Sequence, residues 1–205
     1  MSPPRLLLIR HGQTSWNVER RVLGRTDIPL DEEGLRQAAA LAAILEPVHT
    51  LWASPLSRAR STAEAVAAAQ SGVALQIEPD LTEMDQGEMD GCGEAEMRAR
   101  FAPVLSRWNV DPTDERLPGG ETLREVQERG LAALARIAAA TPEGASVAVV
   151  SHQLLISAVL CGLRGEPLSS WRGHAHKNTA WSEVVWGPVP EVVATKVAPH
   201  LDEPR

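Results

Sequence analysis

The feature that most constrains the fold is a short apolar run near the N-terminus that ends abruptly in polar residues. Residues 6–9, Leu-Leu-Leu-Ile, are followed at once by Arg10, His11, Gly12 and Gln13. A run of this length predicts a buried strand, and ligands of open α/β sheets bind at the carboxyl ends of the strands. The sequence therefore predicts a sheet that presents a cation and an imidazole side by side at a binding edge.

Strand and helix patterns alternate along the rest of the chain. Strands are predicted at residues 6–9, 50–53, 74–77, 146–150, 182–186 and 192–197. Helices are predicted after an Asp31 N-cap as far as Pro47, after a Ser54 N-cap with Pro55 at the first helical position, and over residues 94–108, 121–139 and 153–163. The first helix should bury one apolar face, residues 35, 38, 41, 42 and 45. This alternation predicts an α/β three-layer sandwich with a mostly parallel central sheet and helices on both faces.

Length and composition exclude several classes of protein. The 205 residues suit a single domain over 1–205, with a loose tail expected at 199–205. No apolar run approaches the length that a bilayer requires, and the N-terminus does not suit a signal peptide, so a cytoplasmic location is expected. The net charge of −7 argues against nucleic-acid and membrane partners, although a few arginines in a concave site still allow an anionic substrate.

Polar groups follow three of the predicted strands and are expected to meet at one sheet edge: Arg10 with His11, residues 54–60, and Ser151 with His152. Phosphoryl transfer needs a nucleophile, donors for the phosphoryl oxygens and an acid for the leaving oxygen. An imidazole is a nucleophile only while its attacking nitrogen is unprotonated, which neighbouring guanidinium groups favour. A backbone carbonyl accepting from the other ring nitrogen would fix the tautomer.

The segment 6–17, LLLIRHGQTSWN, resembles the signature of the histidine phosphatase superfamily, the phosphoglycerate mutase-like proteins that form a phosphohistidine intermediate. The resemblance spans about residues 6–186 and implies that family's fold, with no cofactor and no metal. It implies that the phosphate pocket consists of Arg10, His11, Arg58 and His152. It assigns the acid that protonates the leaving group, and then activates water, to Glu83 within LTEMDQGEMDG. Further substrate contacts are implied for Thr14, Asn17, Gln13, Leu23, Gly24 and Gln153.

Two positions depart from the family pattern. Gln153 stands where the family commonly has glycine after its second histidine, and its longer side chain is expected to narrow the pocket. Met89 replaces the usual aromatic residue in the glycine-flanked turn. Neither change removes a catalytic group.

The pattern is more similar to broad-specificity or small-metabolite phosphatases than to cofactor-dependent mutases. The chain has no tyrosine, no lysine before Lys177 and no adjacent pair at Arg98 and Arg100, and the segment between Glu83 and His152 is short. We therefore predict a metal-independent phosphomonoesterase that acts on a small-molecule phosphate ester. The alternatives are a cofactor-dependent phosphoglycerate mutase and a non-catalytic phospholigand-binding module.

Some features have no readable role in the sequence. The ester that is used depends on the roof of the pocket, residues 84–120, to which Met84, Met89 and Trp108 are candidate contributors. His174 and His176 are expected to be structural or surface residues rather than metal ligands, because two histidines lack a third ligand. The oligomeric state stays open.

Overall fold

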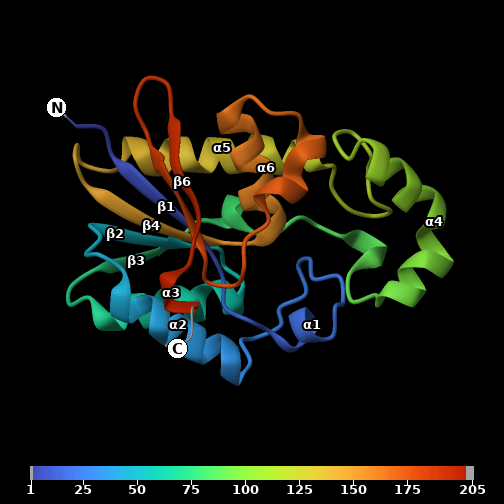
Figure 1. Cartoon of the computed structure of the whole chain (residues 1–205), viewed down its shortest axis with the longest axis horizontal. Coiled ribbons are helices and arrows are strands. Elements are labelled where there is room, and N and C mark those ends of the chain that lie inside the picture. Colours follow the sequence, from blue (N-terminus) through green and yellow to red (C-terminus); the bar gives the residue numbers. More distant parts are fainter. Residues whose placement is uncertain (1, 202–205) are drawn as a thin grey trace.

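The computed structural model describes residues 2–201, which form a six-stranded sheet in the order β3-β2-β4-β1-β5-β6 (Figure 1). The strands are β1 (Arg5–Arg10), β2 (Thr50–Ala53), β3 (Ala74–Ile77), β4 (Ser146–Ser151), β5 (Trp181–Val185) and β6 (Glu191–Val197). Strands β1, β2, β3 and β4 run parallel to one another, whereas β5 pairs antiparallel with β1 and β6 pairs antiparallel with β5. The predicted mostly parallel α/β sheet is confirmed.

Helices cover both faces of the sheet. The α-helices are α1 (Ser15–Val18), α2 (Glu32–Ile44), α3 (Ser57–Ala69), α4 (Glu94–Val110), α5 (Leu123–Ala139) and α6 (Gln153–Arg164). The 3₁₀ turns are η1 (Pro79–Leu81), η2 (Gly87–Met89), η3 (Leu168–His174) and η4 (Pro199–Leu201). In Figure 1, α2 and α3 lie on one side of the sheet, α5 and α6 lie on the other, and α4 stands apart at one end.

The apolar run of β1 is explained by burial on both faces. Successive side chains of a strand point to opposite faces. Leu7 and Ile9 therefore pack into the core shared with α2 and α3, while Leu6 and Leu8 pack into the core shared with α5 and α6. A strand covered on both sides reads as continuously apolar rather than alternating.

The register of three parallel strands places their polar ends together. Arg10 of β1 lies opposite Ser151 of β4, and Ala53 of β2 lies opposite Val150 of β4. The next residues along the chain are His11, His152 and Ser54, so these three side chains leave neighbouring strand ends at the same edge of the sheet.

Two local predictions about the helices are wrong. Helix α3 begins at Ser57 with Leu56 at its N-cap position, two residues later than predicted, and the Ser54 hydroxyl lies against His152 instead of capping the helix. In α2 the Asp31 N-cap is as predicted, with its carboxylate accepting from the Gly34 N–H at 2.8 Å. Leu35, however, is 55% exposed and does not belong to the buried face.

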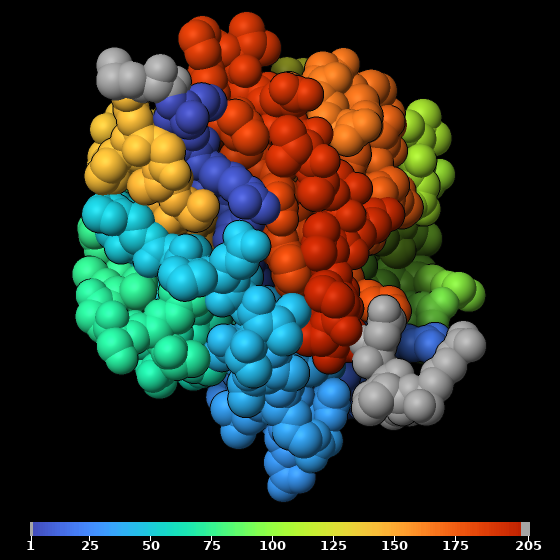
Figure 2. Space-filling model, turned by 60° about the vertical axis from the view of Figure 1, so that its left-hand side comes forward, coloured from blue at the N-terminus to red at the C-terminus, as the bar shows by residue number. Residues whose placement is uncertain are grey.

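The expected loose tail at 199–205 begins with a packed turn. The His200 ring stacks on Trp181 with 6.0 Å between centroids, and its Nε2 lies 2.7 Å from the Thr179 hydroxyl. In Figure 2 the last strands and η4 (red) lie beside β1 (dark blue) and α2 (light blue). Residues 202–205 of the expected tail lie outside the described part of the chain.

The helices described within residues 2–201 include none that combines the length and the apolar character needed to cross a membrane.

Candidate active site

The nucleophile predicted at the end of β1 is buried and has a defined tautomer. The Nδ1 of His11 lies 2.6 Å from the Gly12 carbonyl oxygen, so Nδ1 carries the proton and donates it, and Nε2 keeps its lone pair. Burial and the charges of Arg10 and Arg58 hold the pKa of His11 well below its usual value. The ring is therefore neutral and able to attack an electrophile at neutral pH.

The position after His11 requires glycine because α2 begins against it. A Cβ atom at Gly12 would lie 2.6 Å from the Gly34 carbonyl oxygen in the first turn of α2. The Gly12 N–H donates to the Thr62 hydroxyl at 3.0 Å, and that hydroxyl donates to the Arg58 carbonyl of α3. This chain of contacts ties the nucleophile to the helix that carries Arg58.

Arg58 is a fully buried cation whose hydrogen bonds go only to backbone carbonyls. Its two terminal nitrogens donate to the oxygens of Thr26, at 2.9 Å, and Gly24, at 2.7 Å. Within residues 2–201 it forms no ion pair with a carboxylate. Burial lowers the pKa of Arg58 from its ordinary value, with the nearby charge of Glu83 acting in the opposite direction. A buried guanidinium that lacks a carboxylate partner is stabilised by an anionic ligand.

The guanidinium of Arg10 is also held by a backbone carbonyl. Its Nη1 donates to the carbonyl oxygen of His176 at 2.5 Å. Burial lowers the pKa of Arg10 to about 10, which leaves the guanidinium charged at neutral pH. Asn178, which follows in the same turn, donates from Nδ2 to the His11 carbonyl at 3.0 Å and to the Asn17 side-chain oxygen at 3.2 Å.

His152 completes the group at the end of β4. Its ring centroid lies 5.1 Å from that of His11, and its Nε2 lies 2.7 Å from the Ser54 hydroxyl oxygen. Burial and the charge of Arg58 keep the pKa of His152 well below its usual value, so this ring is also neutral. If Nε2 accepts from the Ser54 hydroxyl, the proton of the ring is on Nδ1.

Three buried nitrogen atoms in this group have no hydrogen-bond partner within residues 2–201: Arg10 Nε, Arg58 Nε and His152 Nδ1. Buried polar atoms are nearly always hydrogen-bonded in folded proteins. All three atoms belong to residues whose charges or rings act on His11. Their number and type suit the oxygens of a bound tetrahedral anion.

Glu83 lies at the start of α6 with its carboxylate buried. It accepts from three backbone N–H groups, those of Met84 at 2.8 Å, Leu154 at 3.1 Å and Leu155 at 3.2 Å. Burial raises the pKa of Glu83, while these N–H groups and the charge of Arg58 oppose that shift. A phosphate dianion bound next to it would raise the pKa further, because like charges disfavour ionisation.

The loop that carries Glu83 is fixed by an arginine that the sequence did not single out. Arg129 of α5 donates to the backbone oxygens of Asp80, Thr82 and Glu83 at 2.6–3.1 Å. Its guanidinium also contacts both carboxylate oxygens of Glu121 at 3.0 Å, and both side chains are largely buried. Arg129 is therefore a positioning residue for the acid.

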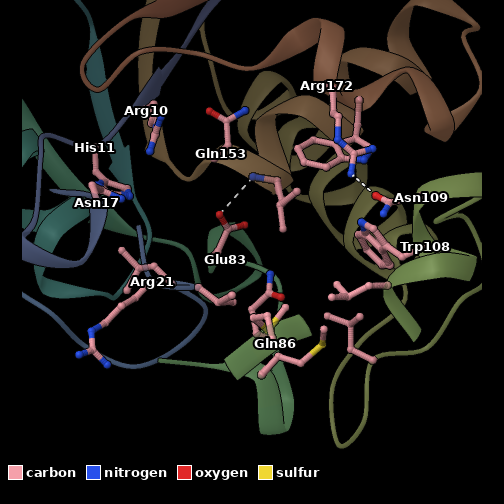
Figure 3. A pocket seen from close by; sticks show the side chains of 18 residues that line it. Arg10, His11, Asn17, Arg21, Glu83, Gln86, Trp108, Asn109, Gln153 and Arg172 are labelled. Atoms are coloured by element: carbon pink, nitrogen blue, oxygen red, sulfur yellow. Dashed lines mark hydrogen bonds between the residues drawn. The ribbon is translucent and has the colours of Figure 1, made fainter. Parts of the chain in front are cut away.

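A pocket of about 410 Å³ opens beside His11. Figure 3 shows Arg10, His11 and Asn17 at one end, Glu83 and Gln153 between, and Trp108, Asn109 and Arg172 at the far end. Of the predicted site residues, these members line it directly: Arg10, His11, Asn17, Leu23, Glu83 and Gln153. Arg58 and His152 lie deeper, behind the opening, where their unpartnered nitrogens are buried.

Three predicted substrate contacts are not among the residues that line the pocket. The Thr14 hydroxyl accepts from the Asn17 N–H and caps α1. The Gln13 side chain donates to Asp31 at 3.1 Å, at the start of α2. Gly24 accepts from Arg58 with its carbonyl oxygen and donates its N–H to Asp90 at 2.8 Å. These residues position the site from behind rather than face the opening.

Gln153 lines the pocket, but other groups hold its side chain. Its oxygen accepts from the His176 N–H at 3.0 Å, and its nitrogen donates to the Ser157 hydroxyl at 2.8 Å. The side chain therefore ties α6 to the segment that presents the His176 carbonyl to Arg10.

The roof contains residues that the sequence did not identify. Met84, Met89 and Trp108 were candidates for the roof from the sequence. Met89 and Trp108 line the pocket, whereas Met84 is fully buried and does not line it. The residues that sequence reasoning missed are Arg21, Val22, Gln86, Met97, Leu105, Asn109, Leu117, Leu154, Trp171 and Arg172. No local pattern marks them, because they come from six separate segments that meet only in the folded chain.

His174 and His176 make separate contacts. His176 is buried between the Ser182 hydroxyl, 2.8 Å from Nε2, and the His174 carbonyl, 2.7 Å from Nδ1. The ring of His174 lies 2.7 Å from a Glu166 oxygen, and the potential ligand atoms of Cys161, Glu166 and His174 lie within 4.8 Å of one another. None of these residues lines the pocket.

Comparison with known proteins agrees with this geometry. A sequence profile of the histidine phosphatase superfamily (branch 1) matches residues 6–195. A probable phosphoglycerate mutase from Cronobacter sakazakii is 34% identical, covering 96% of this chain and 94% of its own. Among solved structures, YhfR from Bacillus stearothermophilus is similar with a TM-score of 0.90 and 27% identity, over 97% of this chain and 100% of that one.

A further solved structure is a mycobacterial glucosyl-3-phosphoglycerate phosphatase in complex with VO3. It has a TM-score of 0.85 and 28% identity, over 94% of this chain and 98% of that one. The strand order, the arginine and histidine pocket and these similarities lead to one conclusion. The chain belongs to the histidine phosphatase superfamily, branch 1.

Proposed function

We propose that the protein is a metal-independent phosphomonoesterase that works through a phosphohistidine on His11. The observation that carries this proposal is the set of three unpartnered buried donors, Arg10 Nε, Arg58 Nε and His152 Nδ1, beside a neutral imidazole with a free lone pair. Such an arrangement holds a phosphoryl group by charged and directional donors while a nucleophile attacks it.

In the first step, the Nε2 lone pair of His11 attacks phosphorus in line with the ester oxygen. The P–O bond to the leaving group breaks, and the proton of Glu83 passes to the leaving oxygen. The ring of His11 carries positive charge while it is phosphorylated, and the Gly12 carbonyl that accepts from Nδ1 stabilises that charge.

In the second step, the Glu83 carboxylate takes a proton from a water molecule, and the resulting hydroxide attacks phosphorus. The P–N bond breaks and its electron pair returns to Nε2 of His11. Phosphate leaves, and both His11 and Glu83 regain their starting protonation states. Arg10, Arg58 and His152 stabilise the charge on the phosphoryl oxygens in both steps.

The test is to quench the enzyme during turnover of a labelled phosphate ester, with a chelator present. We expect phosphate on His11 that is labile in acid and stable in alkali, and His11→Ala should lack both this label and turnover. The exposed His49 offers a matched control, since His49→Ala should retain both. Wild-type turnover in His11→Ala would refute the mechanism, and a wild-type protein that never acquires the label would favour a non-catalytic phospholigand-binding module.

Phosphoglycerate mutase activity is the second candidate, because the relative from Cronobacter sakazakii carries that name. A cofactor-dependent mutase passes the phosphoryl group of His11 to a bound phosphoglycerate instead of to water. The two activities separate when 3-phosphoglycerate is supplied with and without 2,3-bisphosphoglycerate. Formation of 2-phosphoglycerate faster than release of phosphate would identify a mutase.

A further inference from the structure

The pocket extends well beyond the groups that act on phosphorus. Its volume of about 410 Å³ lies in the range of sites that enclose a whole small molecule. A phosphoryl group occupies only the end formed by Arg10, His11 and Asn17 (Figure 3). The remaining space must take the leaving group of the ester.

The far end of this space is mostly apolar. Its distal wall, as we call it, consists of Met97, Leu105, Trp108, Leu117, Leu154 and Trp171. Three of these come from α4 and one from η3, so two elements far apart in the sequence face each other across the opening. Tryptophan and methionine side chains bind flat apolar groups well because they offer a large, polarisable contact area.

The arginines that line the pocket in addition to Arg10 already hold contacts within the protein. Arg21 donates to the Glu19 carboxylate at 2.6 Å and to the Gly91 carbonyl at 3.0 Å. Arg172 lies over the Trp171 ring, 4.6 Å from its centroid, and donates to Asn109 at 2.8 Å. Among residues 2–201, Glu83 is the only carboxylate that lines the pocket, and it lies at the catalytic end. A small, highly charged leaving group such as glycerate would therefore find mostly apolar contacts at the distal wall.

We propose that the distal wall is a leaving-group subsite that selects phosphate monoesters of bulky, flat, apolar alcohols. The Arg172–Asn109 pair joins η3 to α4 at the rim and gives such a group one polar edge. This inference rests on the proposed phosphatase function and adds the class of substrate to it.

The experiment compares two esters whose leaving groups are primary alkoxides of similar basicity, 2-naphthylmethyl phosphate and ethyl phosphate. Their chemical steps are then alike, so a difference in kcat/KM measures contacts with the leaving group. We expect the naphthylmethyl ester to be preferred roughly 30- to 100-fold, because each small apolar group that is buried changes kcat/KM by about tenfold or more. The kcat/KM for 3-phosphoglycerate should also be lower than that for the naphthylmethyl ester.

Two variants test whether the distal wall causes the preference for the naphthylmethyl ester. Trp108→Ala removes one apolar surface, and Leu105→Asp adds a charge to the distal wall. Each should reduce the preference for the naphthylmethyl ester about tenfold or more. Val110 is also in α4 and is 80% exposed, so Val110→Ala is the matched control and should leave the preference unchanged.

The outcomes separate this inference from the function on which it rests. Release of phosphate from neither ester would refute the phosphatase function itself. Equal kcat/KM for the two esters would refute the subsite and leave the phosphatase intact. A preference for the naphthylmethyl ester that survives both Trp108→Ala and Leu105→Asp would also refute the subsite. The subsite would likewise be refuted if both variants lowered kcat/KM equally for the two esters.

Discussion

The hydroxyl of Ser54 lies 2.7 Å from Nε2 of His152, although 98 positions separate the two residues in the chain. The contact joins the ends of β2 and β4 directly beneath the place where a phosphoryl group would bind. If the hydroxyl donates to Nε2, the ring proton is on Nδ1, the nitrogen that has no hydrogen-bond partner within residues 2–201.

Ser54→Ala is therefore expected to lower kcat by about tenfold, because the imidazole can then place its proton on either nitrogen. This loss is smaller than the 10²- to 10³-fold cost of removing an oxyanion donor, since the ring itself remains. KM should change less than kcat. The measurement is a kcat and KM comparison with Ser57→Ala, which lacks only an exposed contact with Asp27. Equal effects of the two variants would mean that Ser54 does not act through His152.

Glu83→Gln should affect the two half-reactions differently according to the leaving group. A glutamine cannot protonate an alkoxide or activate water, and such proton transfers contribute about 10²- to 10⁴-fold. With an alkyl ester, kcat should fall by at least 10²-fold. With 4-nitrophenyl phosphate, whose leaving group needs no proton, we expect a rapid burst of about one nitrophenolate per site, followed by slow turnover. Stopped-flow absorbance at 400 nm, a wavelength we choose for nitrophenolate, detects the burst, and its absence would assign the acid to another group.

The stability of the fold should decrease as the solution becomes acidic. Three buried histidines are affected: His11 and His152, whose pKa values lie well below the usual one, and His176, whose pKa burial lowers to about 4. Below pH 6.5 the unfolded chain binds protons that the folded chain does not, so the free energy of unfolding falls. Each histidine contributes about 2 kcal/mol between pH 7 and pH 5, or roughly 6 kcal/mol together.

The raised pKa of Glu83 acts in the opposite direction, because the folded protein then takes up a proton before the unfolded chain does. One group does not offset three, so the net change stays a loss. Urea titrations at pH 7, 6 and 5 measure this change in the free energy of unfolding. His176→Gln should reduce the decrease between pH 7 and pH 5 by about one third. A free energy of unfolding that is constant between pH 7 and pH 5 would contradict the neutral, buried state of these rings.

Arg129→Met should destabilise the protein and weaken catalysis together. The substitution removes a donor that Glu121 and three backbone carbonyls share, which costs roughly 2–3 kcal/mol in the free energy of unfolding. Because the freed loop carries Glu83, kcat for an alkyl ester should fall more than kcat for 4-nitrophenyl phosphate. Arg136 of the same helix pairs with Asp80 at an exposed position, so Arg136→Met is the control and should change the stability by less than about 1 kcal/mol. A uniform loss with both esters would indicate that Arg129 does not act through the acid.

Much of the architecture and the centre of the site follow from local sequence patterns. Two apolar segments form buried strands, one before Arg10 and His11 and one before His152. The parallel pairing of these strands brings the two imidazoles together. The sequence also predicts a carbonyl acceptor for the second ring nitrogen of His11, and Gly12 provides it. These features depend on one or two neighbouring segments, so a local pattern is sufficient to predict them.

Features that depend on distant partners were not predicted correctly. The Ser54-Pro55 pair is typical of a helix start, but His152 takes the hydroxyl, and α3 begins later. Leu35 matches the helical period of the buried face, yet no core residue covers it. Arg129 and the residues of the distal wall have ordinary helical surroundings in the sequence, and their roles arise only when α4, α5 and η3 meet the loop of Glu83.

The carboxylate of Glu83 also serves as the missing cap of α6, because it accepts the N–H groups of Leu154 and Leu155, while His152 at the cap position provides no side-chain bond. Under the proposed mechanism, the proton donor is therefore also the cap of α6. A change in the charge of this carboxyl group during turnover would then change the electrostatic stabilisation of the first turn of that helix.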